Sequence, residues 1–189
     1  MTTIVAVRKN GIAAIAADTL TTFGNTRLPS HLDASHDKIL RIDNSFVGVC
    51  GSAAHHLVLI NLLAKSPDVQ LNSKAEIFET FRKLHPILKE ECYLNPKEDE
   101  EDPYESSQIT ALIVNAHGIF GIYSMREVFE YTQYWAIGSG HEFALGALHH
   151  AYSHYDSAVD IARAGVDAGI ALDKNSSAPV TLYQVALQD

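Results

Sequence analysis

The sequence predicts an α+β fold: a four-layer αββα sandwich in which two stacked antiparallel sheets are flanked by helices. The expected elements follow one another as strands, two helices, strands, two helices and a final strand. Hairpins on both sides of the first helix pair argue against a doubly wound parallel sheet, because parallel neighbours need crossover connections. A length of 189 residues with 47% apolar residues fits one domain or two small ones, and we expect a single domain over residues 1–189.

Strands are predicted where apolar and β-branched residues run between turn signals. The first run leads into Asn10-Gly11, a strong two-residue hairpin turn, and the almost wholly apolar run after it reads as a buried returning strand. His117-Gly118 marks a second hairpin, whereas residues 24–37 are polar and rich in turn formers. The expected strands cover residues 3–8, 12–17, 38–42, 46–50, 109–115, 119–123, 128–137 and 180–186.

Helices are predicted where apolar residues recur at helical spacing behind a capping residue. Ser52 is a good N-cap for the first helix, and Ser73 with Glu76 forms a capping box for the second. Pro86 should kink or divide that second helix because proline removes a helical hydrogen bond. The expected helices cover residues 52–65, 73–88, 142–155 and 157–172.

Charge and cysteine content exclude several classes of function. The net charge of −9 argues against nucleic acid or an anionic membrane as partner, because phosphate binding needs a basic patch. The acidic run at residues 97–102 reads as a solvated loop. Only Cys50 and Cys92 are present, which favours a reducing cytoplasm over a disulfide framework. The apolar N-terminal run is too short for a signal peptide, and no run approaches a membrane span.

Ten histidines invite a metal hypothesis. The adjacent pairs 55–56 and 149–150 point about 100° apart on a helix, so neither pair can easily share one ion. His150 and His154 have helical spacing but lack the glutamate of a metalloprotease motif. We therefore expect neither a metal nor another cofactor.

Some residues stand where chemistry could occur, although each alone reads as an ordinary turn, strand-end or surface residue. Asp18 follows an apolar strand, and Ser139 lies between two glycines. The candidate catalytic residues are Thr2, Asp18, Lys38, Gly51, Ser139, Asp173 and Ser176.

Together these residues resemble the proteasome β-type and HslV-like threonine peptidases, which are N-terminal-nucleophile (Ntn) hydrolases. The resemblance includes the opening Thr-Thr-Ile-Val-Ala-Val-Arg, a Gly-x-Ala-Ala segment, a Gly-Ser-Gly turn and a proteasomal Asp-x-x-Ser motif. The matches cover the chain in order, at residues 2–11, 16–18, 24–26, 37–39, 50–54, 136–140 and 173–177.

The chemistry implied by this resemblance is attack by a threonine hydroxyl on a peptide bond. A hydroxyl needs an adjacent base, and the α-amine of Thr2 can serve once Met1 is removed. A positive Lys38 disfavours protonation of that amine, and Asp18 would hold Lys38 in place. The backbone N–H of Gly51 is suited to an oxyanion, a donor whose loss typically costs about 2.7 to 4 kcal/mol.

The resemblance also implies supporting and substrate-binding residues. Ser139, Asp173 and Ser176 would surround the α-amine as hydrogen-bonding support. The substrate-binding residues would be Thr21, Thr22, His36, Val49 and Ala53. Thr22 would bind substrate through its backbone, and the last three would line the pocket for the side chain before the cut. Val49 and Ala53 predict a modest preference for apolar side chains there.

Departures from HslV favour a bacterial group outside it, such as the β-proteobacterial proteasome homologues. Residues 26–37 form a longer loop, the segment 97–107 looks inserted, and the Asp-x-x-Ser motif is proteasomal. The resemblance implies a homo-oligomer of two stacked rings, each of six or seven subunits, that degrades peptides or unfolded proteins. An ATP-dependent unfoldase is a further candidate partner.

Two alternatives stay open at this point. One is a catalytically silent ring subunit, in which a retained Met1 would block the amine of Thr2. The other is an Ntn amidohydrolase that acts on a small amide, although such enzymes often begin with Cys or Ser, and the Lys38 and Gly-Ser-Gly matches speak against it.

Overall fold

The computed structural model describes residues 2–51, 53–66, 69–97 and 100–188. The first sheet contains β1 (Ile4–Lys9), β2 (Ile12–Asp18), β10 (Tyr134–Ile137) and β11 (Val180–Ala186). Its strand order is β10-β1-β2-β11, and every neighbour is antiparallel. Asn10 and Gly11 join β1 to β2 with φ angles of 50° and 76°, so the predicted hairpin is confirmed.

The second sheet has the order β5-β6-β7-β8-β9 and is also antiparallel throughout. Residues 128–137 were expected to continue as strands together, but the two sheets divide them. β9 pairs with β8, whereas β10 crosses to β1. The strands of this sheet are β5 (Ile39–Ile42), β6 (Ser45–Cys50), β7 (Thr110–Asn115), β8 (Gly118–Ile122) and β9 (Val128–Tyr131).

Two helix pairs cover the sheets. They are α1 (Ala53–Lys65), α2 (Lys74–Glu90), α3 (His141–His154) and α4 (Ala158–Leu172). Ser73 Oγ accepts the Glu76 N–H at 3.3 Å, as the capping box predicts, while the Ser52 cap prediction lies outside the described residues. Pro86 was expected to kink or divide α2, and the division is wrong, because α2 continues to Glu90. One lost hydrogen bond is outweighed by the buried apolar face that holds α2 on both sides of the proline.

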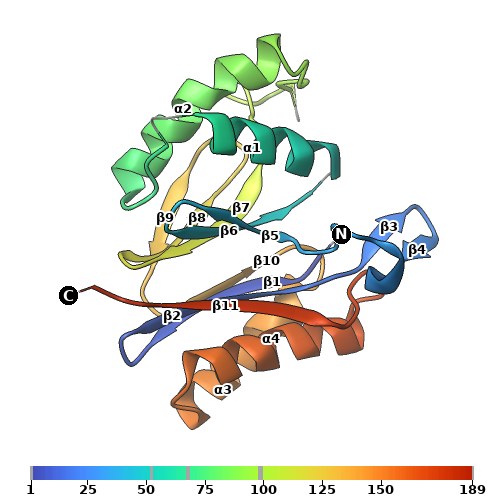
Figure 1. Cartoon of the computed structure of the whole chain (residues 1–189), viewed down its shortest axis with the longest axis vertical. Helices are drawn as coiled ribbons and strands as arrows, with labels where there is room; N and C mark the ends of the chain where they lie inside the picture. Colours follow the sequence, from blue (N-terminus) through green and yellow to red (C-terminus); the bar gives the residue numbers. More distant parts are fainter. Residues whose placement is uncertain (1, 52, 67–68, 98–99, 189) are drawn as a thin grey trace.

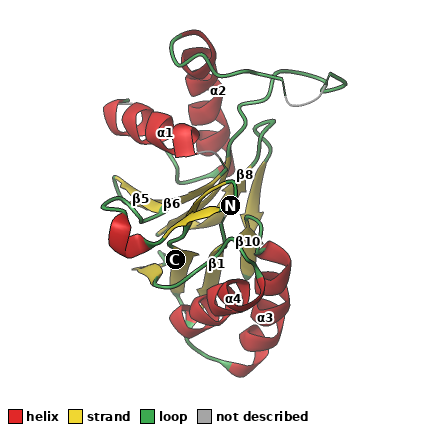
Figure 2. Cartoon of the chain, turned by 90° about the vertical axis from the view of Figure 1, so that its right-hand side faces the viewer, coloured by secondary structure: helices red, strands yellow, loops and turns green. Residues whose placement is uncertain are grey.

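The elements form four layers, which confirms the predicted αββα sandwich. The pair α1 and α2 covers the five-stranded sheet, and the pair α3 and α4 covers the four-stranded sheet (Figure 1). A view turned by 90° shows the same two helix pairs on opposite sides of the stacked sheets (Figure 2). No helix in the described ranges is long and apolar enough to cross a membrane.

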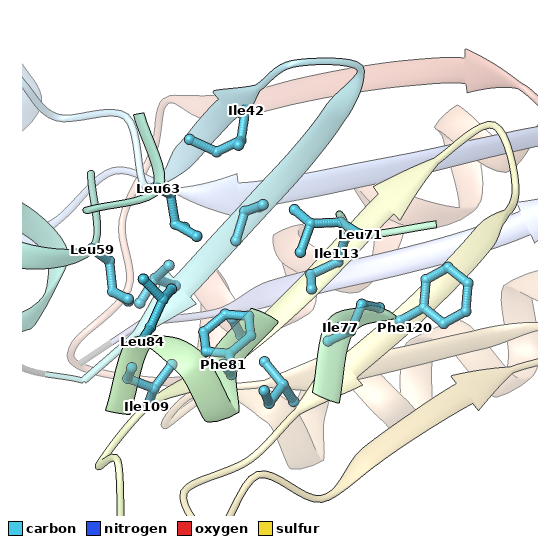
Figure 3. Packing of buried hydrophobic residues seen from close by; sticks show 14 of the residues in the cluster. Ile42, Leu59, Leu63, Leu71, Ile77, Phe81, Leu84, Ile109, Ile113 and Phe120 are labelled. Atoms are coloured by element: carbon cyan, nitrogen blue, oxygen red, sulfur yellow. The ribbon is translucent and has the colours of Figure 1, made fainter. Parts of the chain in front are cut away.

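The outer core lies between α2 and the five-stranded sheet. Ile77, Phe81 and Leu84 project from one face of α2 toward Ile113 and Phe120 of the sheet (Figure 3). Phe81 and Phe120 are each 1% exposed. Burying one such side chain stabilises the fold by roughly 1.5 to 3 kcal/mol, so this face fixes α2 on the sheet.

The four-stranded sheet is buried on both faces, which explains its continuous apolar strands. Ile4 and Ala6 of β1 belong to the core between the sheets, whereas Val5 and Val7 pack with α3 and α4. Successive strand residues point to opposite faces, so a strand covered on both sides shows no polar alternation.

A short hairpin was missed in the sequence. β3 (Thr21–Phe23) pairs with β4 (Thr26–Leu28), and a 3₁₀ turn, η1 (Ser30–Leu32), follows in the stretch expected to be turn-rich. Gly24, at φ +58°, and Asn25 form its two-residue turn. The hairpin lies beside the N-terminal end of the chain (Figure 1).

Candidate active site

The pairing of β1 with β2 brings the first residues next to Asp18. Ile4 is opposite Ala17 in the register, so Thr3 and Asp18 follow at the same end of the sheet. Asp18 N donates to Thr3 O at 3.1 Å, and Thr3 N donates to Asp18 Oδ1 at 2.9 Å. Thr2 therefore lies just before β1, at the end of the sheet, where it is 4% exposed.

Lys38 joins this group immediately before β5 begins. Its Nζ lies 2.8 Å from Asp18 Oδ1, and its side chain is 10% exposed against 0% for Asp18. Burial lowers the pKa of Lys38, and the attraction of Asp18 only partly opposes this. Asp18 Oδ2 also accepts the N–H groups of Leu20 (3.0 Å) and Ser177 (3.1 Å), so both carboxylate oxygens are satisfied.

Ser139, Asp173 and Ser176 form a second hydrogen-bonded group, which contacts Thr2 and Thr3. Thr2 N donates to Ser139 Oγ at 3.1 Å, and Ser139 Oγ donates to Asp173 Oδ2 at 2.6 Å. Ser176 Oγ donates to the same oxygen at 2.9 Å and lies 2.7 Å from Thr3 Oγ1. The Gly-Ser-Gly turn and the Asp-x-x-Ser motif thus meet at Thr2 and Thr3.

The carboxylate of Asp173 is surrounded by donors. Burial alone would raise its pKa, but hydrogen bonds from Ser139, Asn175 and Ser176 outweigh burial and lower it. Asn175 contributes through both its backbone N–H and its side-chain Nδ2, each 3.1 Å from Asp173 Oδ1. Asp173 is therefore held as an anion that orients Ser139 and Ser176.

The glycines of the Gly-Ser-Gly turn allow this close approach. A Cβ at Gly138, whose φ is +93°, would lie 2.1 Å from Thr2 O. A Cβ at Gly140 would lie 2.0 Å from Thr3 Oγ1. Both distances are far below van der Waals contact, so only glycine at positions 138 and 140 leaves room for Thr2 and Thr3.

A cleft of about 710 Å³ opens beside Thr2. Lys38 and Gly51 line it with Thr2, and Gly51 has φ +125° between β6 and α1. Among the expected substrate-binding residues, the cleft is lined by Thr21, Thr22, His36 and Val49. Ala53 begins α1, but its side chain lies outside the described part of the chain.

Some contributors to this site were not singled out from the sequence. Thr3 contacts both hydrogen-bonded groups, Asn175 holds Asp173, and His56 lines the cleft. Asn175 could have been found from its place inside the Asp-x-x-Ser motif, whereas nothing in the sequence distinguishes His56 from a surface histidine. Within the described ranges, no group of three or more His, Cys, Asp or Glu side chains is placed to hold a metal ion.

The sandwich architecture, with residues 2 and 3 at the end of an inner sheet, is the fold of the Ntn hydrolases. A family model described as "Proteasome subunit" matches residues 1–185 of the chain. The chain belongs to the proteasome subunit family. A search of curated proteins gives no match.

Solved structures agree with this assignment. Thiobacillus denitrificans BPH, a bacterial proteasome homologue, is 40% identical over 99% of each chain, with a TM-score of 0.93. Its complex with epoxomicin is 39% identical over 100% of each chain, with the same TM-score. Eukaryotic HslV from Trypanosoma brucei is 22% identical over 98% of this chain and 99% of its own, with a TM-score of 0.72, and shares the fold.

Proposed function

We propose that the chain is a threonine endopeptidase subunit in which Thr2 is the nucleophile after removal of Met1. The observation that carries this proposal is that Thr2 N donates to Ser139 Oγ while its neighbour Thr3 is bound to Asp18 and thereby linked to Lys38. In the full sequence this nitrogen belongs to the peptide bond between Met1 and Thr2. Once Met1 is removed it becomes an α-amine, and the unprotonated amine can act as the base for the hydroxyl of its own residue.

The proposed reaction proceeds through an ester. The unprotonated α-amine of Thr2 takes the hydroxyl proton as Oγ1 attacks the carbonyl carbon of the peptide bond. The same proton then passes to the leaving amine, the C–N bond breaks, and the acyl group remains on Oγ1. Water, activated by the amine in the same way, hydrolyses the ester and restores Thr2. The Gly51 N–H is proposed to stabilise the oxyanion of both tetrahedral intermediates.

The two hydrogen-bonded groups would have different roles. Lys38, kept near Thr2 by Asp18, would disfavour a second positive charge on the α-amine and so keep it available as a base. Ser139, oriented by Asp173, would fix the position of the amine, and Ser176 would complete that support. Preorganised groups of this kind contribute because they need no rearrangement during the reaction.

We propose that peptide substrates bind in the cleft beside Thr2. Thr21 and Thr22 would flank the substrate, while His36, Val49 and Ala53 would line the pocket for the side chain before the cut. Thiobacillus denitrificans BPH is known in complex with epoxomicin. We expect this chain to bind epoxomicin in the cleft beside Thr2.

We further propose that the subunits form a homo-oligomer of two stacked rings of six or seven in the cytoplasm. A closed ring of identical subunits requires heterologous interfaces, in which different faces of neighbours meet. Unfolded proteins or peptides would be the substrates. An ATP-dependent unfoldase is the proposed partner that would supply the unfolded proteins.

The test begins with the intact mass of the protein purified from its native host, which should correspond to a chain beginning at Thr2. Wild type should cleave short fluorogenic peptides. Thr2→Ala should assemble equally but lose turnover, while Thr2→Ser, which keeps a hydroxyl, should retain part of it. Normal peptidase activity in Thr2→Ala would refute the nucleophile assignment. Retention of Met1 without turnover would instead favour the silent ring subunit.

A further inference from the structure

A histidine on the first helix faces the proposed substrate cleft. His56 lies in α1 and lines the cleft together with Leu57 and Ile60. His36 and Val49, two of the residues expected to line the pocket for the side chain before the cut, line the same cleft. His56 therefore lies on the wall expected to receive that side chain.

The other imidazole and charged side chains near this wall are already engaged. Lys38 is bound to Asp18, and the His36 ring contacts Asp33 O at 3.0 Å through Nδ1. Asp37 accepts a hydrogen bond of 2.5 Å from the Tyr183 hydroxyl. The imidazole of His56 makes no hydrogen bond within the described residues 2–51, 53–66, 69–97 and 100–188. Its polar ring atoms are thus available to a ligand.

The charge state of His56 indicates what kind of ligand group it can bind. Burial lowers the pKa of His56, the negative Asp37 opposes that shift, and Lys38 adds to it. The imidazole is therefore neutral at neutral pH, with one N–H donor and one acceptor nitrogen. Such a group suits a neutral hydroxyl.

Apolar side chains line the same cleft, namely Leu20, Ile39, Val49, Leu57 and Ile60. A ligand side chain that contacts both these residues and His56 combines a large apolar body with a polar end. Tyrosine has this form, and phenylalanine has the same body without the hydroxyl.

We infer that His56 determines specificity for the side chain preceding the cut, favouring tyrosine over phenylalanine through a hydrogen bond to the tyrosine hydroxyl. This inference rests on the proposed peptidase function. A phenylalanine ring would displace water from the imidazole and leave it without a partner, which costs more than the loss of the hydrogen bond alone. The expected preference is about tenfold in kcat/KM.

The experiment compares two fluorogenic peptides that differ only in Tyr or Phe before the cut, using the full-length assembled protein. The ratio of their kcat/KM values should be about 10 for wild type and about 1 for His56→Leu. His56→Gln, which keeps a donor and an acceptor, should restore part of the preference. The matched control is His55→Leu: His55 lines a separate cavity of about 280 Å³, so the ratio should stay at its wild-type value.

The outcomes separate the two proposals. A ratio near 1 in wild type, or an unchanged ratio in His56→Leu, overturns the role of His56 while the peptidase remains. A peptidase activity that survives Thr2→Ala, or the absence of cleavage of either peptide, overturns the proposed function and the inference with it. The ratio is measured on one preparation, so loss of folded protein in a variant does not change it.

Discussion

The backbone amide of Thr3 and the ammonium of Lys38 donate to the same oxygen of Asp18, at 2.9 and 2.8 Å. The Asp18 side chain is completely buried, so water cannot take the place of this oxygen as the acceptor for the two donors. The position of the first strand and the position of Lys38 are consequently set by one carboxylate. Loss of that carboxylate should disturb both the fold and the proposed chemistry.

We expect Asp18→Asn to lower the free energy of unfolding by about 3 to 5 kcal/mol, because it leaves a buried ammonium without its counter-charge. Peptidase activity should fall with it. Thermal and denaturant unfolding of the variant measure the first effect. Glu79→Gln is the control, since its ion pair with Arg82 is exposed and its removal should leave the unfolding midpoint unchanged. Equal unfolding midpoints for Asp18→Asn and Glu79→Gln would contradict the role of Asp18 as the buried counter-charge of Lys38.

Gly138→Ala should displace Thr2. Its Cβ would lie 2.1 Å from Thr2 O at a φ of +93°, so we expect a loss of more than about 2 kcal/mol of stability together with loss of activity. Gly146→Ala is the matched control on α3, where a new Cβ meets nothing within 4 Å. That control should stabilise the protein by roughly 0.5 to 1 kcal/mol. Unfolding curves and peptidase assays of both variants provide the measurement.

Asp173 should contribute stability in a defined pH range. Its folded-state pKa is lowered, so its contribution is present above the unfolded-state pKa of about 3.9 and is lost as the pH falls through the folded value. Asp173→Asn should therefore be less stable than wild type at pH 7, by about 1 to 3 kcal/mol. The difference should narrow below pH 4. A difference that stays constant down to pH 3 would mean that the charge of Asp173 is unimportant.

The pH dependence of kcat/KM should be bell-shaped. The acid limb would report protonation of the α-amine of Thr2, whose unperturbed pKa is about 7.7 to 8.0 and which a positive Lys38 lowers. The alkaline limb would report loss of the Lys38 proton. Because burial lowers the pKa of Lys38, this limb should appear below its ordinary value of 10.5. In Lys38→Arg, whose guanidinium stays charged, the alkaline limb should disappear.

The outer core offers a further comparison on one helix. Phe81→Ala should cost about 3 to 5 kcal/mol of unfolding free energy, because Phe81 is 1% exposed between α2 and the sheet. Phe78→Ala, three residues earlier and 45% exposed, should cost far less. Equal losses of unfolding free energy in the two variants would contradict the packing of the Phe81 face of α2 against the sheet. Denaturant titrations of the two variants measure this difference.

The sequence predicts elements best where a local signal specifies them. The Asn10-Gly11 turn and the Ser73 cap act within a few residues, and both appear in the structure. The β3–β4 hairpin was missed because its strands are three residues long and little buried. The division of residues 128–137 between two sheets depends on which partner each strand meets, and that partner is distant in sequence.

The site could be predicted only in part, because its contacts also join residues that are distant in sequence. Family motifs point to residues such as Lys38 and Ser139, but no local pattern tells which oxygen of Asp18 or Asp173 each donor reaches. His56 could not be recognised, because its significance comes from the cleft it faces rather than from its neighbours in sequence. Thr3 was overlooked because a β-branched residue at the start of a strand is ordinary.

The hydrogen bond between Thr3 and Ser176 joins residues 173 positions apart, and that between Thr2 and Ser139 spans 137. A ribosome adds roughly 5 to 20 residues each second, so a growing chain waits many seconds before these partners exist. A polypeptide still attached to the ribosome therefore cannot hold Thr2 in its final surroundings. Translation itself would keep the proposed protease inert while other nascent proteins are close by.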